Sequence, residues 1–84
     1  MQAIPDLPEK LLRAEGFVVE TPSGDVGTVE AFHPGPRPGT PGFVMVRGGW
    51  FGRRRMMVSA VDVCAFLPSQ RRIRVRSTGM KITN

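Results

Sequence analysis

The residues with the most evident binding chemistry in this 84-residue chain lie at a glycine-rich turn. Trp50 and Phe51 stand between glycines, and Arg53, Arg54 and Arg55 follow directly. Aromatic rings beside arginines stack on nucleic-acid bases, enter a membrane interface or anchor a protein interface. The same rings can instead fold back and close one end of a small core. Among the binding uses, the pattern favours a protein interface.

A second group of arginines lies nearer the C-terminus. Arg72, Arg74 and Arg76 alternate with aliphatic residues, which is typical of a strand with one buried and one charged face. Along a strand the three would span roughly 13–14 Å, the reach of two or three phosphates, without reading any base. Alternatively they form a solvated face, with Glu20 or Glu30 opposite some of them. The candidate nucleic-acid contacts are therefore Arg53, Arg54, Arg55, Arg72, Arg74 and Arg76.

Charge is distributed unevenly along the chain, whose net charge is +5. Residues 1–46 hold three basic and six acidic side chains, a net charge of −3. Residues 47–84 hold nine basic side chains and one acidic side chain, a net charge of +8. A basic half indicates an anionic partner such as RNA, DNA or a membrane surface, or simply an arginine-rich soluble domain.

No set of residues indicates catalysis, so an enzyme is not expected. His33 is the only histidine, and no Asp, Ser or Cys stands close to it in sequence as a partner. The acidic residues are scattered, which favours solvated strand faces over a general acid–base pair. One histidine and one cysteine predict neither a metal site nor a cofactor. Cys64 lies in an apolar run and is expected to be a buried structural thiol.

The elements that would carry these residues begin with a short helix or clasp in residues 1–15. Asp6 and Glu9 have the spacing of a capping box, and Gly16 suits a left-handed stop. Leu11 belongs to an apolar stripe that can lie against a core. A helix this short needs that packing to be stable.

After Gly16 the apolar period becomes two, which predicts strands. The predicted strands are residues 17–21, 25–32, 43–47, 54–59, 61–67 and 71–77. Gly27 marks a bulge or bend, and strict alternation around it places Val29 and Phe32 on opposite faces. Residues 33–42 contain four prolines and form a connection, while residues 78–84 are expected to be a flexible tail. This spacing favours a small, closed or nearly closed antiparallel barrel of five or six strands.

The segments FVVETPSGDVGTVEAF, GFVMVRGGWFGRRRMMVSAVDVCAF and RIRVRS resemble the PRC-barrel family over residues 16–77. The shared layout is a turn ending at Gly24, a Gly-x-Val strand at Gly27 and Val29, a glycine-rich hairpin tip and a closing strand. Ser59 departs from a proline that is frequent in the family. The resemblance implies a non-catalytic binding or assembly module, as in the reaction-centre H subunit and the ribosome maturation factor.

Residues 17–32 also resemble the KOW motif of ribosomal and transcription-factor barrels, which bind RNA or protein. Both families are SH3-like small barrels. The sequence therefore predicts a protein-interaction module over residues 16–77, with an RNA- or ribosome-associated barrel as the alternative. The expected partner-binding residues are Trp50, Phe51, Arg47 and Met45. A homodimer is expected to suit so small a core, and the absence of a leader or a membrane-spanning run predicts a cytoplasmic protein.

Overall fold

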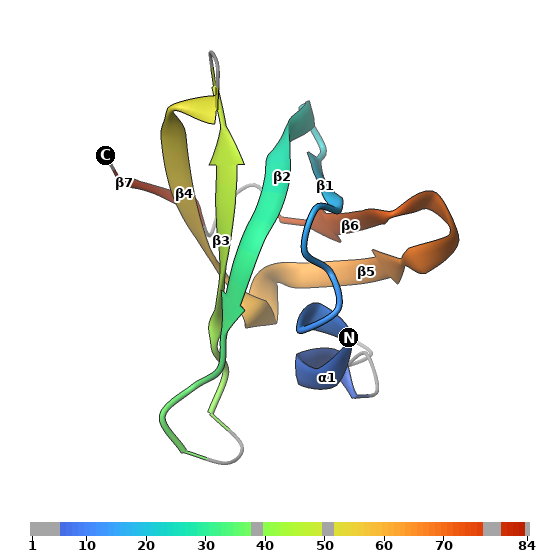
Figure 1. The fold of residues 1–84 in the computed structure, drawn as a ribbon, viewed down its shortest axis with the longest axis vertical. Coiled ribbons are helices and arrows are strands. Elements are labelled where there is room, and N and C mark those ends of the chain that lie inside the picture. The colour runs from blue at the N-terminus through green and yellow to red at the C-terminus, as the bar shows by residue number, and fades with distance from the viewer. Residues whose placement is uncertain (1–5, 38–39, 50–51, 77–79, 84) are drawn as a thin grey trace.

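The structure, a computed structural model, describes residues 6–37, 40–49, 52–76 and 80–83, the last four by their backbone only. These residues form mainly β-structure with one short α-helix, as the sequence predicts (Figure 1). The elements are α1 (Leu7–Leu11), β1 (Val18–Thr21), β2 (Gly24–His33), β3 (Phe43–Gly48), β4 (Arg54–Ser59), β5 (Val63–Leu67), β6 (Arg72–Val75) and β7 (Met80–Thr83). Two 3-10 turns, η2 (Ala60–Asp62) and η3 (Pro68–Gln70), flank β5. The described part of the chain contains no helix long and apolar enough to cross a membrane.

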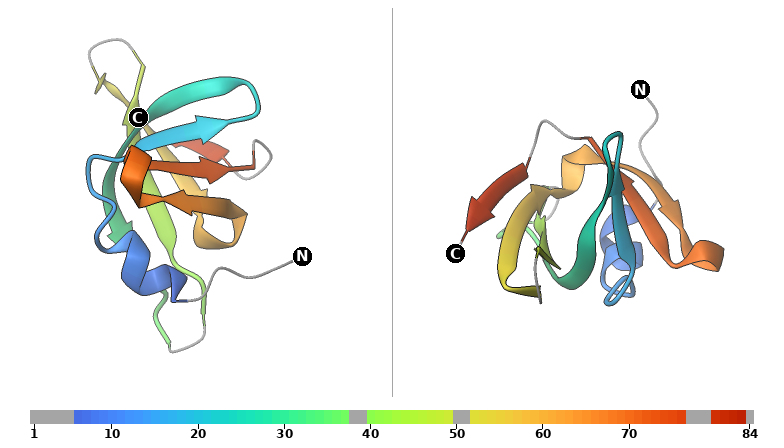
Figure 2. Two further views of the ribbon diagram at one scale, coloured as in Figure 1. Left: turned by 90° about the vertical axis from the view of Figure 1, so that its right-hand side faces the viewer. Right: turned by 90° about the horizontal axis from the view of Figure 1, so that it is seen from above.

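The strands form one curved, mixed sheet in the order β5-β6-β1-β2-β3-β4-β7. β1 and β6 pair in parallel, whereas the other neighbours are antiparallel. Seen from above, the sheet follows an arch from β7 to β5, and β5 and β6 run across the direction of β2–β4 (Figures 1 and 2). No ladder among the described residues joins β5 to β7, so the sheet is open. The sequence predicts an antiparallel barrel that is closed or nearly closed, and the parallel β1–β6 pair and the open sheet correct this expectation.

The hydrophobic core fills the concave side of this arch. Alternate residues of the strands supply it, together with residues of α1 and the segment that follows α1. The most deeply buried large side chains are Leu11, Val19, Val44, Val46, Val58, Ile73 and Val75. Burial of several aliphatic side chains contributes on the order of 1.5–3 kcal/mol for each side chain. The helix therefore depends on the sheet, because Leu11 is almost completely buried there.

The start of α1 differs from the predicted capping box. Asp6 has a left-handed backbone (φ 54°), and its side chain makes no cap hydrogen bond. A capping carboxylate needs an extended backbone to reach the free N–H groups of the first turn. The Asp6 carbonyl instead accepts a hydrogen bond from the Lys10 N–H at 3.0 Å. Gly16 has the predicted left-handed backbone (φ 84°), but it does not end the helix, which stops at Leu11 with Leu12 as its C-cap.

Two irregularities shape β2. Beside Gly27 the β1–β2 register shifts, which confirms the predicted bulge; a Cβ atom at Gly27 would lie 2.3 Å from the Arg47 carbonyl oxygen. A second shift follows Val29, and Glu30 is the extra residue. This bulge shifts the alternation of inward and outward side chains along β2 by one residue, so Val29 and Phe32 are both buried. The prediction that they lie on opposite faces was wrong, because one extra residue moves every later side chain to the other face.

The second half of the chain follows the predicted order with local corrections. β4 has the predicted bounds, whereas η2 occupies the beginning of the predicted strand 61–67. Cys64 is exposed, and its thiol donates to the Arg74 carbonyl oxygen at 3.5 Å. The expected burial of Cys64 was wrong because a register shift between Val63 and Ala65 leaves it outside the regular β5–β6 alternation. Residues 80–83, assigned by sequence to the tail, form β7 beside β4.

Candidate binding surface

The outer face of β2, β3 and β4 carries a row of apolar side chains. Along β3, Val44 and Val46 are buried, whereas Phe43 and Met45 are half-buried on the opposite face. Met45 pairs with Met57 of β4 and with Ala31 of β2, all of them half-buried. These side chains form a contiguous apolar strip on the convex side of the sheet, called here the outer strip: Ala31, Phe43, Met45 and Met57.

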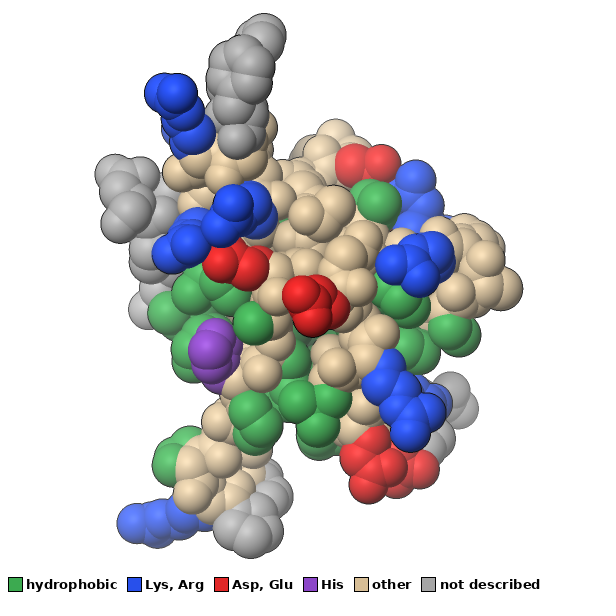
Figure 3. All heavy atoms as spheres, in the orientation of Figure 1, with side chains coloured by type: hydrophobic (Ala, Val, Ile, Leu, Met, Phe, Trp, Pro, Cys, Tyr) green, Lys and Arg blue, Asp and Glu red, His purple; other side chains and the backbone are tan. Residues whose placement is uncertain are grey.

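His33 lies at one end of the outer strip. It pairs with Phe43 across the β2–β3 ladder, and the two rings stack with centroids 4.8 Å apart. The ring is exposed, at the point where β2 passes into the proline-rich connection. Figure 3 shows the strip's side of the molecule, with hydrophobic side chains gathered beside the histidine and below a group of opposite charges. Stacking on Phe43 extends the apolar surface of the strip.

Three charged side chains border the other end of the strip. Arg47 and Arg55 are direct partners across β3 and β4, an arrangement of like charges that is unfavourable by itself. The bulge brings Glu30 between them: its Oε1 lies 3.2 Å from Arg47 Nη2 and 3.1 Å from Arg55 Nη2. We call Glu30, Arg47 and Arg55 the β3–β4 charge cluster. It holds two cations and one anion, and both arginine side chains are about half exposed (48% and 52%).

A second cluster lies across β1, the beginning of β2 and β6. Arg72 Nη1 donates to Asp25 Oδ1 at 2.7 Å and to Glu20 Oε1 at 3.2 Å, and Arg74 Nε donates to Glu20 Oε2 at 2.6 Å. We call Glu20, Asp25, Arg72 and Arg74 the β6 charge cluster. Its two cations and two anions balance. The hydrogen bond and charge of Asp25, with a smaller contribution from Glu20, raise the pKa of Arg72.

The direction of that pKa shift determines the pH range in which the Arg72 contacts stabilise the fold. A pKa raised on folding stabilises the fold at every pH below the ordinary arginine value and stops doing so only above it. Arg72 is therefore charged at any pH at which proteins are normally handled.

The sequence left undecided whether the two groups of arginines lie on one surface. The structure shows that they lie apart. β4 and β6 are not neighbours, because β1, β2 and β3 stand between them. Arg72 and Arg74 face carboxylates, as the solvated-face alternative anticipated. Arg53 and Arg54 are exposed at the β3–β4 hairpin, whereas Arg76 is half-buried just after β6. The six candidate phosphate contacts thus do not form one continuous row.

The four predicted partner-binding residues divide into two pairs. Met45 and Arg47 lie on the outer face of β3, one within the outer strip and the other in the β3–β4 charge cluster. Trp50 and Phe51 lie outside the described residues. Sequence reasoning did not include Phe43, Met57 or Glu30 in the site. Only the cross-strand register and the bulge bring these residues to the same face.

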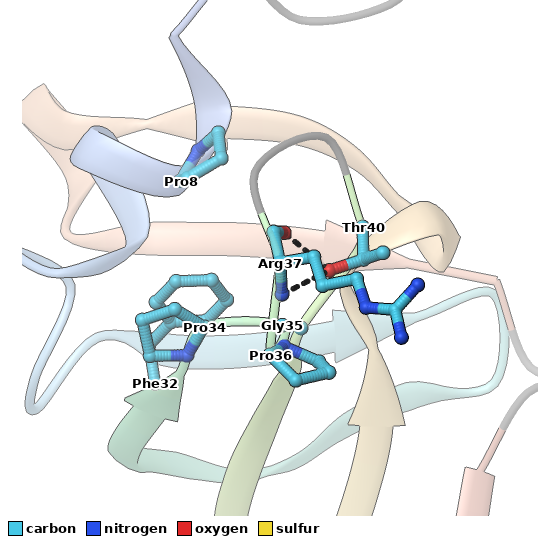
Figure 4. A pocket seen from close by; sticks show the side chains of 8 residues that line it. Pro8, Phe32, Pro34, Gly35, Pro36, Arg37 and Thr40 are labelled. Atoms are coloured by element: carbon cyan, nitrogen blue, oxygen red, sulfur yellow. Dashed lines mark hydrogen bonds between the residues drawn. The ribbon is translucent and has the colours of Figure 1, made fainter.

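A separate hollow of about 270 Å³ lies between the start of α1 and the proline-rich connection. Prolines and glycines supply most of its lining, with Phe32 and Arg37 beside them (Figure 4). The Thr40 hydroxyl donates to the Arg37 carbonyl and accepts from the Arg37 N–H, which braces the connection. Among the described residues the lining has one cationic group, Arg37, one hydroxyl, Thr40, and no carboxylate, so it offers less binding chemistry than the outer face of β2–β4.

Comparison of the chain with family models, with curated proteins and with solved structures finds no match.

Proposed function

We propose that the protein is a non-catalytic interaction module that binds a protein partner through the outer face of β2–β4. The observation that carries this proposal is the outer strip, half-exposed and adjoining two half-exposed arginines. Met, aromatic side chains and Arg are the residue types enriched in protein interfaces, while Lys, Asp and Glu are depleted there. Within this face the acidic side chain is Glu30, and it is held by the two arginines.

The position of the strip on the convex side supports the same proposal. The concave side is occupied by the protein's own core, and the buried members of β3 and β4 already fill it. Phe43, Met45 and Met57 are therefore not needed to complete that core. Apolar surface of this kind gains from being covered by a partner.

We also propose that the chain belongs to a family of PRC-type, SH3-like barrels. The order of a tight hairpin, a longer connection, a second hairpin and a charged closing strand supports it. In this assignment the chain is a variant of the barrel that has a parallel β1–β6 pair and an open sheet. Members of that family act as binding or assembly modules, which agrees with the proposed use of the outer face.

The RNA- or ribosome-associated alternative stays a prediction. A phosphate that approached Arg72 or Arg74 would have to compete with Glu20 and Asp25. Because the β6 charge cluster has no excess of cations, its electrostatic attraction for a polyanion is weak. The protein-interaction proposal does not depend on these arginines.

Site-specific photo-crosslinking tests the proposal. A benzophenone amino acid replaces Met57 on the outer face, and in a matched variant it replaces Ser69, which is exposed on η3. In nuclease-treated lysate the Met57 variant is expected to give one discrete crosslinked protein, identified by mass spectrometry, that Ser69 does not give. Adding Met45→Asp to the Met57 variant should abolish that product. Equal crosslinking from both positions, or none from Met57, would contradict the proposal.

A further inference from the structure

We propose that the partner presents an acidic segment that also carries apolar side chains. Its carboxylates bind at Arg47 and Arg55, and its apolar side chains cover Met45 and Met57. This inference rests on the proposed function and adds the chemical class of the partner.

The charge of the β3–β4 charge cluster is the first argument. Two half-exposed guanidinium groups share one carboxylate oxygen of Glu30, so these three side chains together carry two positive charges and one negative charge, a sum of +1. The β6 charge cluster contains the same residue types with one more carboxylate and is neutral. Guanidinium–carboxylate hydrogen bonds are short and strong, and planar carboxylates fit the guanidinium geometry. Two half-exposed guanidinium groups at the border of an apolar strip therefore favour an anionic group there.

The same charge argues against a second copy of this chain as the occupant. A symmetric dimer places the same patch on both sides of its interface. Two copies of this face would bring Arg47 and Arg55 against their own counterparts, and facing like charges oppose association. An acidic partner meets no such repulsion.

The neighbouring side chains argue against nucleic acid as the occupant. Contacts to a phosphate backbone need several cations spaced along the strand, and each contact adds to the salt dependence. Here the pair of arginines is followed by methionine and phenylalanine side chains, which match apolar protein side chains. The arginines of the β6 charge cluster lie on a strand that three others separate from β4, so they do not extend the row.

Glu30 occupies the position at which a partner carboxylate would bind. Its Oε1 contacts both arginines, whereas among the described residues its buried Oε2 accepts no hydrogen bond. The partner's carboxylate therefore competes with Glu30 or joins it. Removing the Glu30 charge raises the net charge of the cluster from +1 to +2. We expect Glu30→Gln to strengthen binding of an acidic segment.

The probes are synthetic octapeptides of alternating composition: Glu/Leu, Glu/Ser and Lys/Leu, with octauridylate as the nucleic-acid probe. Each is titrated into the full chain at low salt, and amide chemical shifts are followed by NMR. The Glu/Leu peptide should bind, with the shift changes concentrated on β3 and β4. The Glu/Ser peptide should bind about tenfold more weakly because it leaves the outer strip uncovered. The Lys/Leu peptide should not bind.

Two substitutions with matched geometry supply the control. Glu30 and Glu20 are each held by two arginines, and each side chain is 29% exposed. Glu30→Gln should bind the Glu/Leu peptide about fivefold more tightly, which corresponds to about 1 kcal/mol. Glu20→Gln should leave the affinity within about twofold. Equal effects of the two would mean that only the overall charge of the protein matters, and would overturn the proposal.

Other outcomes overturn it as well. Equal binding of Lys/Leu and Glu/Leu peptides would remove the acidic requirement, and tighter binding of octauridylate on β3 and β4 would replace the protein segment with nucleic acid. A dimer in light scattering that Met45→Asp dissociates would make a second copy the occupant. If no peptide binds while Met57 still crosslinks a protein, the partner class fails and the proposed function stands. If Met57 also fails to crosslink, both fail.

Discussion

Two places on the outer surface hold a glutamate between two arginines, and they differ in what surrounds the group. In the β6 charge cluster, Asp25 adds a second carboxylate, and the contacts connect the β1–β2 hairpin to β6. In the β3–β4 charge cluster, the arginines are direct cross-strand partners and adjoin the outer strip. The first group holds distant strands together. The second places two half-exposed guanidinium groups beside apolar surface, which suits recognition.

The difference shows that residue type alone does not identify a binding surface. Arg74 and Arg55 are almost equally exposed, at 53% and 52%, and each contacts a glutamate. Their neighbours decide the role: Arg74 shares its glutamate with an arginine that Asp25 also neutralises, whereas Arg55 and Arg47 share Glu30 and adjoin the outer strip. Local charge balance and adjacent apolar area separate a structural pair from a candidate contact.

The largest expected effect comes from Gly27, which lies between the two regions. A Cβ atom there would lie 2.3 Å from the Arg47 carbonyl oxygen and would force β2 away from β3. Gly27→Ala is expected to lower the free energy of unfolding by about 2–3 kcal/mol, measured by urea denaturation. Gly24→Ala is the control, because Gly24 has a positive φ of 121° but open space around it; it should cost about 1 kcal/mol. Equal losses would show that the close strand approach is not constraining.

A smaller effect separates the two charge clusters. Arg72→Met removes a side chain that bridges two carboxylates, and we expect the melting temperature to fall by a few degrees at low salt. Arg55→Met relieves the opposition of Arg47 and Arg55, so its melting temperature should stay the same or rise slightly. High salt should reduce the difference between the two variants, because exposed ion pairs are screened. If Arg55→Met lowered the melting temperature more than Arg72→Met, the β3–β4 charge cluster and not the β6 charge cluster would be the stabilising one.

Much of the region around the candidate surface could be predicted from sequence. The bounds of β4, the outward positions of Met45 and Arg47, and the glycine-rich hairpin follow from alternation and turn composition. The Glu30 bulge could not be predicted, because neither glycine nor proline marks it, and it reverses the parity of the rest of β2. The pairing of Met45 with Met57 needs the cross-strand register as well.

The long-range arrangement was also beyond the sequence pattern. Alternation in residues 72–75 shows which side chains are buried but not which strand lies alongside, so the parallel pairing of β1 and β6 was missed. The exposed position of Cys64 depends on a register shift that an apolar run does not reveal. β7 pairs with β4 and covers that side of it, a pairing that the weak pattern of the last residues does not reveal. Each of these features depends on contacts between distant segments.

The smallest expected effect concerns the outer strip itself. Met45→Ser should lower the free energy of unfolding by about 1 kcal/mol or less, because Met45 is only half-buried on the convex side. Val46→Ala, one residue along and fully buried, should cost about 2 kcal/mol in the same urea titration. If Met45→Ser were as destabilising as Val46→Ala, the strip would be part of the core and not a surface kept for a partner.

The most direct measurement compares the affinity of the Glu/Leu octapeptide for Arg55→Met and Arg74→Met. The two arginines match in exposure and in carboxylate contact, and both variants lose one positive charge. If the outer face of β2–β4 binds an acidic, apolar segment, Arg55→Met weakens binding by about tenfold, while Arg74→Met stays within about twofold of the unmodified protein. Equal losses in the two variants, or a greater loss with Arg74→Met, would contradict this assignment of the binding surface.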